Sequence, residues 1–275
     1  MILVVNADGA GVDPARDLGI LRAAREGIVR SASVLAALPA AADLVAAARD
    51  VPALGLGLHI NLTEGMPLVG GHRSLVEAGG RFAGKRELWR RAVAGLIDER
   101  ECAREIEAQW ARLESLGVRP LHLNGRHHVH FFPGVAEAVL RVAPPGTWVR
   151  RAKGLPPAVS LPSDVYAAPG VLAGAIAALD RRIEWPRLRS ADRFAGLELP
   201  PGYSPGDLIR LLRAIGSEDA EVVELLALSG ENPEGSGPAS VSADREREVE
   251  ALTCECIHAF VETQEIRLSS FAGVP

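Results

Sequence analysis

The chain has 275 residues, of which 48% are hydrophobic, and a formal net charge of −5 at pH 7. This length and apolar content are enough to bury a large core, and no Ser/Gly linker or charge block divides the chain, which favours one domain over residues 1–275. The acidic balance provides no basic field for a phosphate backbone, so we expect no nucleic-acid partner.

The first residues, Met1 to Asn6, lack the pattern of a secretory signal peptide, and no uncharged apolar run is long enough to span a bilayer. We therefore expect a cytoplasmic protein with no membrane partner. Three cysteines are an odd number in a long chain and do not suggest a disulfide framework. Cys254 and Cys256 lie two positions apart in a helical pattern, where their side chains diverge, so we expect reduced thiols rather than a metal site.

Strands and helices alternate along the first part of the chain. A buried strand is predicted at 2–6, and an amphipathic helix follows in which Asp13 is the N-cap, Pro14 the first residue and Gly27 a left-handed closing residue. The next elements in order are a strand at 33–38, a helix at 40–49 and a strand at 54–60.

An insertion rich in Gly and Pro runs from 61 to about 98, and a helix that ends at Gly117 follows it. The remaining predicted elements are a strand at 120–124, a helix at 135–142, a strand at 147–150, an irregular Pro-rich stretch to about 205, a helix at 205–215, a strand at 221–228, a helix at 244–263 and a strand at 265–271.

This alternation predicts an α/β fold in which right-handed crossovers join mainly parallel strands. Seven or so repeats are enough to close a ring, so we predict a distorted TIM-like (β/α) barrel, with an open doubly wound sheet as the alternative. In a barrel the active site lies at the carboxyl ends of the strands. Asp8, His59 and the segment 122–130 all lie at or just after such ends.

Asp8 follows the first strand in the segment Asn6-Ala7-Asp8-Gly9. The segment matches neither a G-x-G-x-x-G nor a Walker phosphate loop. A carboxylate held at the end of a buried strand can act as a general base or as a metal ligand. The alternative is an Asx turn or a cap that leads into the next loop.

Histidines gather after two further strands. His59 ends the apolar strand that contains Gly57, and its alternative role is a core histidine bonded to backbone. Four of the seven histidines lie within residues 122–130. Imidazoles gathered in this way can bind a transition metal or shuttle protons, and the alternative is a solvated His-rich loop. If that segment stays extended, one face carries His122, Asn124, Arg126, His128 and His130.

Together these segments resemble the YdjC-like carbohydrate deacetylases, a family that includes chitooligosaccharide deacetylases and hopanoid-associated relatives. The matching segments cover essentially the whole chain in the family's order, and they are Asn6-Ala7-Asp8, the turn 27–29 with Ser31 and Ser33, Gly57-Leu58-His59 with 63–68, the run 122–130, Asp192-Arg193-Phe194-Ala195-Gly196 and Arg245-Glu246-Arg247-Glu248.

The resemblance implies a metal-dependent hydrolase that removes N-acetyl groups from amino sugars. In that chemistry a divalent ion, Zn or Mg, activates its bound water, a carboxylate takes the proton and a histidine protonates the leaving amine. We expect Asp8, Arg126 and His128 to be catalytic and His59 to be the retained metal ligand. We expect the sugar to contact Asn6, Asn124, His130 and Glu64.

The chain departs from the family pattern at the metal site. Gly9 stands where the family has an aspartate ligand, and Arg126 replaces a histidine ligand. Asn124 and Gly125 replace the Asp and Ser before it, and Leu228-Ser229-Gly230 replaces the His-Pro-Gly that carries the leaving-group acid. Because a guanidinium stays protonated and repels cations, the sequence predicts a degenerate metal site.

Three hypotheses follow for a protein whose ligand is a small sugar or glycoside. The first is an enzyme with altered or metal-independent chemistry, in which Arg126 supplies the positive charge at the vacated metal position. The second is a noncatalytic protein that binds a sugar or a partner. The third is a deacetylase with a displaced metal held by His59 with His128 or His130. We favour an enzyme because Asp8 and these histidines persist, and exposed barrel helices allow a homodimer.

Overall fold

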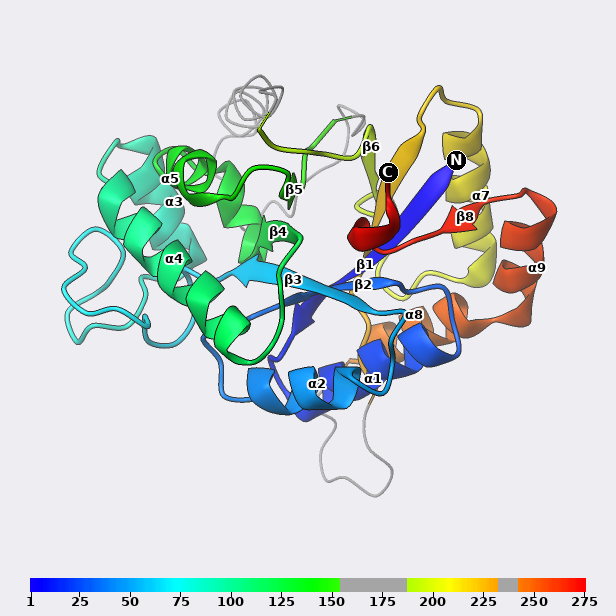
Figure 1. Ribbon diagram of the computed structural model, residues 1–275, viewed down its shortest axis with the longest axis horizontal. Helices are drawn as coiled ribbons and strands as arrows, with labels where there is room; N and C mark the ends of the chain where they lie inside the picture. Colours follow the sequence, from blue (N-terminus) through cyan, green and yellow to red (C-terminus); the bar gives the residue numbers. More distant parts are fainter. Residues whose placement is uncertain (154–186, 232–241) are drawn as a thin grey trace.

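A computed structural model describes residues 1–153, 187–231 and 242–275. Within these ranges the strands form one sheet in the order β5-β4-β3-β2-β1-β7-β6, with β8 paired to β1, and neighbouring strands run parallel. Helices lie outside the curled sheet (Figure 1). A backbone hydrogen bond from Phe194 N to Lys153 O, 3.1 Å long, links the two ends of the strand order. The predicted α/β fold and distorted TIM-like barrel are confirmed.

The strands of this sheet are short. Their bounds are β1 Ile2–Ala10, β2 Ser31–Val34, β3 Gly55–Ile60, β4 His122–Gly125, β5 Trp148–Val149, β6 Arg193–Ala195, β7 Val222–Ala227 and β8 Arg267–Leu268.

The α-helices that surround the sheet are α1 Pro14–Arg25, α2 Ala41–Ala48, α3 Lys85–Val93, α4 Glu99–Ser115, α5 Val135–Val142, α7 Pro205–Gly216, α8 Ala243–Thr253 and α9 Glu255–Thr263. Two 3₁₀ segments, η1 Arg126–Phe131 and η2 Phe271–Gly273, complete the described elements.

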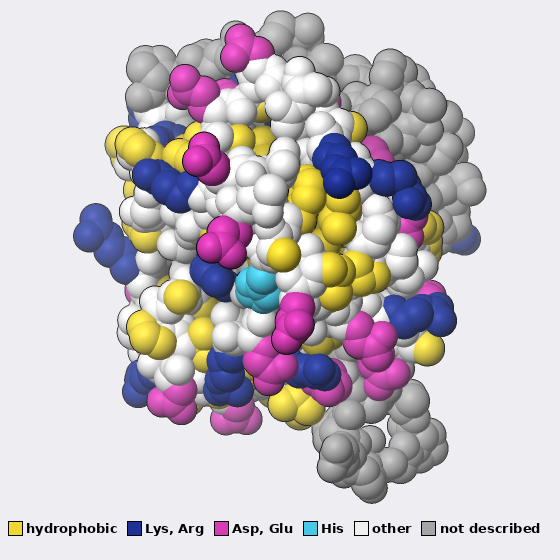
Figure 2. Space-filling model, turned by 90° about the vertical axis from the view of Figure 1, so that its right-hand side faces the viewer, with side chains coloured by type: hydrophobic (Ala, Val, Ile, Leu, Met, Phe, Trp, Pro, Cys, Tyr) yellow, Lys and Arg dark blue, Asp and Glu magenta, His cyan; other side chains and the backbone are white. Residues whose placement is uncertain are grey.

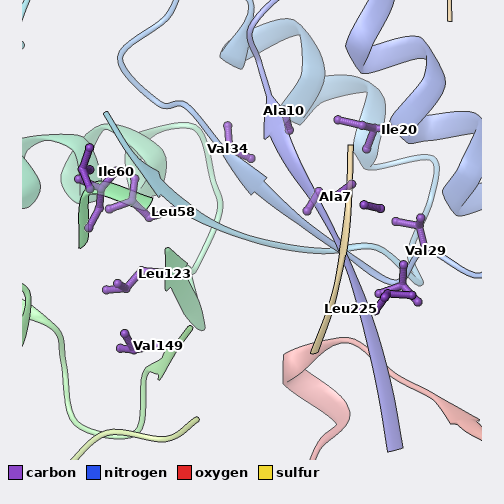
Figure 3. Packing of buried hydrophobic residues seen from close by; sticks show 14 of the residues in the cluster. Ala7, Ala10, Ile20, Val29, Val34, Leu58, Ile60, Leu123, Val149 and Leu225 are labelled. Atoms are coloured by element: carbon purple, nitrogen blue, oxygen red, sulfur yellow. The ribbon is translucent and has the colours of Figure 1, made fainter. Parts of the chain in front are cut away.

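The outer face of the sheet is apolar because alternate strand residues point toward the helices. Ala7 and Val34 from β1 and β2, and Leu58 and Leu123 from β3 and β4, are at most 1% exposed and belong to one large cluster (Figure 3). Burial of such side chains is the main favourable contribution to folding. The helices are thereby held against the sheet.

The inner face is polar toward the carboxyl ends of the strands. Asn6 and Asp8 alternate with the outward residues of β1, and His59, Asn124 and Glu224 do the same on β3, β4 and β7. At the amino ends the inner face is filled by Val4, Trp148, Phe271 and Val274, the last two from the C-terminal segment. The barrel therefore has an apolar base and a buried polar upper interior.

The segment predicted as an insertion, 61–98, contains α3 and is fastened to α4 by two carboxylates. Glu105 accepts hydrogen bonds from the backbone N–H groups of Leu68 and Val69, and Glu101 accepts them from Arg73 and Ser74. Backbone groups of an irregular loop need such partners when they are buried. This pairing orders the loop that carries Glu64.

Several predicted elements differ from the structure. β6 lies within the stretch predicted to be irregular, of which 154–186 falls outside the described residues. The predicted helix 244–263 breaks at Cys254, whose ψ of 134° is not helical. Because of this break, Cys254 and Cys256 approach each other and form a disulfide, so the prediction of reduced thiols there is wrong. Gly27 is not left-handed; a Cβ there would lie 2.4 Å from Leu252 O, so close packing against α8 requires the glycine.

The surface mixes charges of both signs. Figure 2 shows acidic and basic side chains interspersed over the face that it presents, without a broad basic field. In the described part of the chain, no helix combines the length and apolar character needed to cross a membrane.

Gly57 provides a test of the packing inside the barrel. A Cβ on Gly57 would lie 2.4 Å from the His122 ring and from its carbonyl oxygen. We expect Gly57→Ala to lower the free energy of unfolding by about 3 kcal/mol, because neither the buried ring nor the neighbouring strand can move away. Urea denaturation measures the change. The control is Gly216→Ala, where a Cβ meets nothing within 4 Å, and an equal loss in both variants would contradict the packing argument.

Candidate functional site

The site is built around Asp8 at the carboxyl end of β1. Its Oδ1 accepts hydrogen bonds from Asn6 Nδ2 at 2.9 Å, Asn124 Nδ2 at 2.8 Å and Arg150 Nη2 at 2.9 Å. Its Oδ2 accepts one from Arg150 Nη1 at 2.6 Å. Asp8 is only 7% exposed, so these four bonds compensate for most of its lost hydration. They leave Oδ2 as the oxygen with spare acceptor capacity.

Arg150 joins Asp8 to a second buried carboxylate, Glu224 of β7. The Arg150 Nε donates to Glu224 Oε1 at 2.7 Å and its Nη2 lies 2.7 Å from the same oxygen, while both Nη atoms also donate to Asp8. Burial alone would raise the pKa of Asp8, but the Arg150 guanidinium and the neighbouring His59 lower it well below its ordinary value. Burial raises the pKa of Glu224, and the Arg150 guanidinium offsets only part of that rise. Asp8 is therefore a stable carboxylate at neutral pH.

Asn124 links Asp8 to His59 through two hydrogen bonds. The two residues are register partners on β4 and β3, and Asn124 Oδ1 lies 2.6 Å from His59 Nδ1. Since Asn124 Nδ2 donates to Asp8, the amide oxygen faces His59 and accepts a hydrogen bond from the Nδ1–H group of that ring. The lone pair of His59 is therefore on Nε2. Burial lowers the pKa of His59 to about 4, so the ring is neutral at pH 7.

A second chain of polar groups lies beneath Asp8. Asn6 Nδ2 also donates to Ser33 Oγ at 2.9 Å, and that hydroxyl lies 3.2 Å from His122 Nε2. Asp8 and Ser33 are register partners on β1 and β2, which explains the closeness of these groups. Burial lowers the pKa of His122 to about 3. This histidine belongs to the polar interior rather than to an exposed His-rich face.

The histidine-rich run does not stay extended, so the prediction that its alternate residues share one face is wrong. β4 ends at Gly125, and η1 places His127 and His128 in the left-handed region, with φ of 52° and 57°. Gly125 permits the turn because a Cβ there would lie 2.9 Å from His130 Nδ1. The turn separates the strand residues His122 and Asn124 from the residues that follow.

Two imidazoles of this turn have buried nitrogens without hydrogen-bond partners among the described residues. They are Nδ1 of His128 and both ring nitrogens of His130. Burial lowers the pKa of His128 to about 3 and holds that of His130 well below its ordinary value. His130 is fully buried and its ring lies 4.0 Å, centroid to centroid, from that of Phe131. His128 is partly exposed, so it is the better placed of the two to meet a ligand.

Arg126 points to Glu64 and to Gly9. Its Nε and Nη2 donate to Glu64 Oε1 at 3.1 and 2.9 Å, and His127 Nε2 lies 3.2 Å from the same oxygen. The bond with His127 and the charge of Arg126 lower the pKa of Glu64 to about 2. A Cβ on Gly9 would lie 3.5 Å from Arg126 Nη1. The guanidinium thus lies directly beside Gly9.

The structure brings most of the predicted site residues together. Asn6 and Asn124 hold Asp8, His59 bonds Asn124, and Arg126 and Glu64 pair nearby. The amides of Asn6 and Asn124 are committed to this internal network, and their contact with a sugar stays a prediction. Sequence reasoning missed Arg150 and Glu224. A charged residue inside each of two predicted apolar strands, 147–150 and 221–228, is the signal that marks them.

The donor groups do not fit the divalent ion that the family resemblance implies. Among residues 1–153, 187–231 and 242–275, no group of three or more His, Cys, Asp or Glu side chains is arranged to hold a metal. His59 Nε2 has a lone pair, but its acidic neighbour Asp8 is already bound by Arg150, and the charge of Arg126 acts on the same ring. A divalent cation would meet two fixed positive charges there.

Comparison with known proteins identifies a matching family and similar sequences. The family model described as YdjC-like protein matches residues 2–263. A carbohydrate deacetylase from Geobacillus stearothermophilus is 39% identical over 140 residues, 51% of this chain and 55% of the relative. A chitooligosaccharide deacetylase from Serratia marcescens is 36% identical over 156 residues, 56% of this chain and 58% of the relative. The chain thus spans little more than half the length of these relatives.

One crystal structure shares the fold over nearly the whole length. It is an Enterococcus faecalis protein provisionally called a cellobiose-phosphate cleavage protein, which has a TM-score of 0.76 and 22% identity and covers 98% of this chain and 97% of its own. At this identity the likeness concerns the fold alone.

The Arg150 network makes a stability prediction. We expect Arg150→Met to lower the free energy of unfolding by about 3–5 kcal/mol, because two buried carboxylates lose their shared cation. Urea denaturation at pH 7 measures the loss. The control Arg210→Met removes a largely exposed arginine of α7 and should change stability by less than about 0.5 kcal/mol. Equal effects would show that the buried network does not stabilise the fold.

His122 makes a pH prediction. The unfolded chain binds a proton at this histidine near its ordinary pKa of 6.5, whereas the folded chain does so only near 3. Its contribution to stability is therefore present above about pH 6.5 and is lost as the pH falls toward 3. We expect the stability difference between the wild type and His122→Asn to fall by ~1.4 kcal/mol per pH unit below about pH 6.

Chemical denaturation of both proteins between about pH 7 and pH 4 measures this slope. Other titrating groups occur in both proteins and cancel in the difference. A difference that does not change with pH would show that His122 titrates in the folded state as it does in the unfolded chain.

Proposed function

The chain belongs to the YdjC-like family, and we propose that it is a hydrolase of the carbohydrate deacetylase type that acts on an acylated amino sugar with altered, metal-independent chemistry. The observation that carries the proposal is the set of buried hydrogen bonds converging on Asp8. Burying these polar and charged groups costs free energy, and Asn6 Oδ1 has no hydrogen-bond partner within the described residues, so a protein without a use for the carboxylate gains little by keeping the network. Curated relatives named carbohydrate deacetylases support the substrate class.

In this proposal Asp8 is the general base. Its Oδ2 carries one hydrogen bond, from Arg150, and can accept a second from a water that attacks the acyl carbon. Arg150 and the two asparagine amides hold the carboxylate in a single orientation. The low pKa of Asp8 makes it a weak base, so the reaction needs positive charge near the acyl oxygen or a firmly bound substrate.

Arg126 and His128 supply the remaining groups. Arg126 lies beside Gly9, where its charge either stabilises the oxyanion formed in the reaction or binds an anionic group of the substrate. His128 is neutral at pH 7, because burial lowers its pKa to about 3, and its Nδ1 has no partner in the described structure. The proton that Asp8 takes from the water has to reach the leaving amine, and His128 can relay it, accepting a proton at its unpartnered nitrogen and donating the one on its other ring nitrogen to the amine as the C–N bond breaks. His59 orients Asn124 and contributes a lone pair on Nε2.

A noncatalytic sugar-binding protein is the second candidate. The observation that favours it is that Asp8 Oδ1 already accepts three hydrogen bonds and that the pKa of Asp8 is far below neutral. Such a carboxylate serves well as a fixed hydrogen-bond acceptor for sugar hydroxyl groups. Turnover separates the two candidates.

Asp8→Asn tests the proposal. We expect the wild type to release acetate from N-acetylated amino sugars in the presence of a metal chelator, and Asp8→Asn to reduce kcat by about 100-fold to 10,000-fold because the base is removed. Enzymatic detection of acetate is the measurement, and Asp50→Asn at an exposed position is the control. Acetate release that requires zinc would contradict the metal-independent chemistry. No acetate release from any sugar would favour the noncatalytic candidate.

A further inference from the structure

Two arginine side chains from distant parts of the chain converge on Gly9. A Cβ on Gly9 would lie 3.5 Å from Nη1 of Arg16, on α1, and 3.5 Å from Nη1 of Arg126, on η1. Both atoms are therefore within contact distance of one point beside the backbone that follows Asp8. Gly9 has a φ of 88°, which glycine adopts without strain.

The Nη1 groups that face this point are free to donate. Arg126 uses its Nε and Nη2 for Glu64, and Arg16 uses its Nε for Asp13 at 3.4 Å. Neither Nη1 has a hydrogen-bond partner within the described ranges of the chain. Each guanidinium is thus held by a carboxylate on one edge and presents its other edge toward Gly9. The side chains retain 27% and 16% of their exposure, which leaves them accessible to a small ligand.

Two cations this close repel each other, and a third adds to the repulsion. Burial, the charge of Arg126 and the charge of Arg245 together lower the pKa of Arg16. The paired carboxylates, Asp13 and Glu64, offset part of the repulsion from behind. An anion placed between the two Nη1 groups would cancel the remaining repulsion between the guanidinium groups. It would also receive charge-assisted hydrogen bonds from both.

We propose that Arg16 and Arg126 form a binding site for a carboxylate or phosphate group on the sugar ligand, at the position beside Gly9. A carboxylate and a phosphate both present several acceptor oxygens to guanidinium groups, and arginine suits them because its donors are planar and stay charged. The assignment of a sugar as the rest of the ligand rests on the proposed function; the anion site itself does not.

The site has a consequence for specificity. A neutral sugar that enters leaves both Nη1 groups without an acceptor and leaves the repulsion in place, whereas an anionic sugar satisfies both. The anionic group of the ligand would lie next to Asp8. The Asp8 carboxylate repels this group unless Arg16 and Arg126 neutralise the charge of the ligand. The Arg150 guanidinium reduces that repulsion further because it already neutralises Asp8.

The first experiment measures binding of inorganic phosphate to the full chain by isothermal titration calorimetry at low ionic strength. We expect Arg16→Gln and Arg126→Gln each to weaken phosphate binding at least about tenfold, as loss of one charged donor pair requires. The control Arg210→Gln removes an exposed arginine of α7 and should leave the affinity unchanged. Equal affinity in all four proteins, or no phosphate binding to the wild type, overturns the proposal.

The second experiment uses two variants of one size. Gly9→Asp places a carboxylate beside the two Nη1 groups, and Gly9→Asn places a neutral amide there with the same backbone strain. We expect Gly9→Asp to abolish phosphate binding and Gly9→Asn to retain it. Of these two variants, we expect phosphate to raise the Tm of Gly9→Asn and not that of Gly9→Asp. If both variants bind phosphate equally, the site is elsewhere.

The third experiment compares a sugar phosphate and a sugar carboxylate with a neutral sugar. Glucosamine 6-phosphate, glucuronate and glucose are compared by the same calorimetry, and we expect at least one anionic sugar to bind about tenfold more tightly than glucose in the wild type and no more tightly in Arg126→Gln. Anion binding that depends on both arginines without any acetate release leaves the site standing and removes the proposed hydrolase. Acetate release from neutral sugars that is unchanged in Arg16→Gln removes the anion site and leaves the hydrolase.

Discussion

The bidentate pairing of Arg150 with Asp8 is the interaction on which the rest of the site depends. It places a guanidinium inside the barrel, where it is fully buried, and the same cation bonds Glu224 across the sheet. Charges in such surroundings are stable only when each has its partner. Asp8 then orients Asn124, and Asn124 sets the tautomer of His59. One ion pair therefore determines the protonation and direction of groups on four strands.

This polar interior requires glycine at specific places. Parallel strands covered on both faces usually carry apolar residues toward both, but here the inward positions hold Asn, Asp, Ser, His and Glu side chains. The rings of His122 and His130 fit because Gly57 and Gly125 leave room for them. Apolar residues close the amino end of the barrel, so the polar groups lie toward the carboxyl ends of the strands. Side-chain alternation along the strands places these polar residues on the inner face and apolar residues on the outer face.

In the proposed site, the charges beside Asp8 make a cation a poor occupant and an anion a good one. Gly9 contributes no carboxylate, and the guanidinium groups of Arg16 and Arg126 face the space next to it. Glu64 and Asp13 lie behind these arginines and hold them by one edge each. The arrangement replaces a negative set of ligands with a positive pair while the fold and the carboxylate at Asp8 stay in place.

The amino-acid sequence by itself determined the α/β alternation, the strand ends that carry Asp8 and His59, and the family, because periodicity and short motifs are local properties. Only the tertiary structure decided which groups meet. The left-handed turn at His127 and His128, the helix break that pairs Cys254 with Cys256, and the placement of Arg150, Glu224 and Arg16 depend on packing between segments far apart in sequence. A sequence pattern gives the spacing of residues along the chain. The partner of a buried charge comes from another strand, so it depends on how distant segments pack.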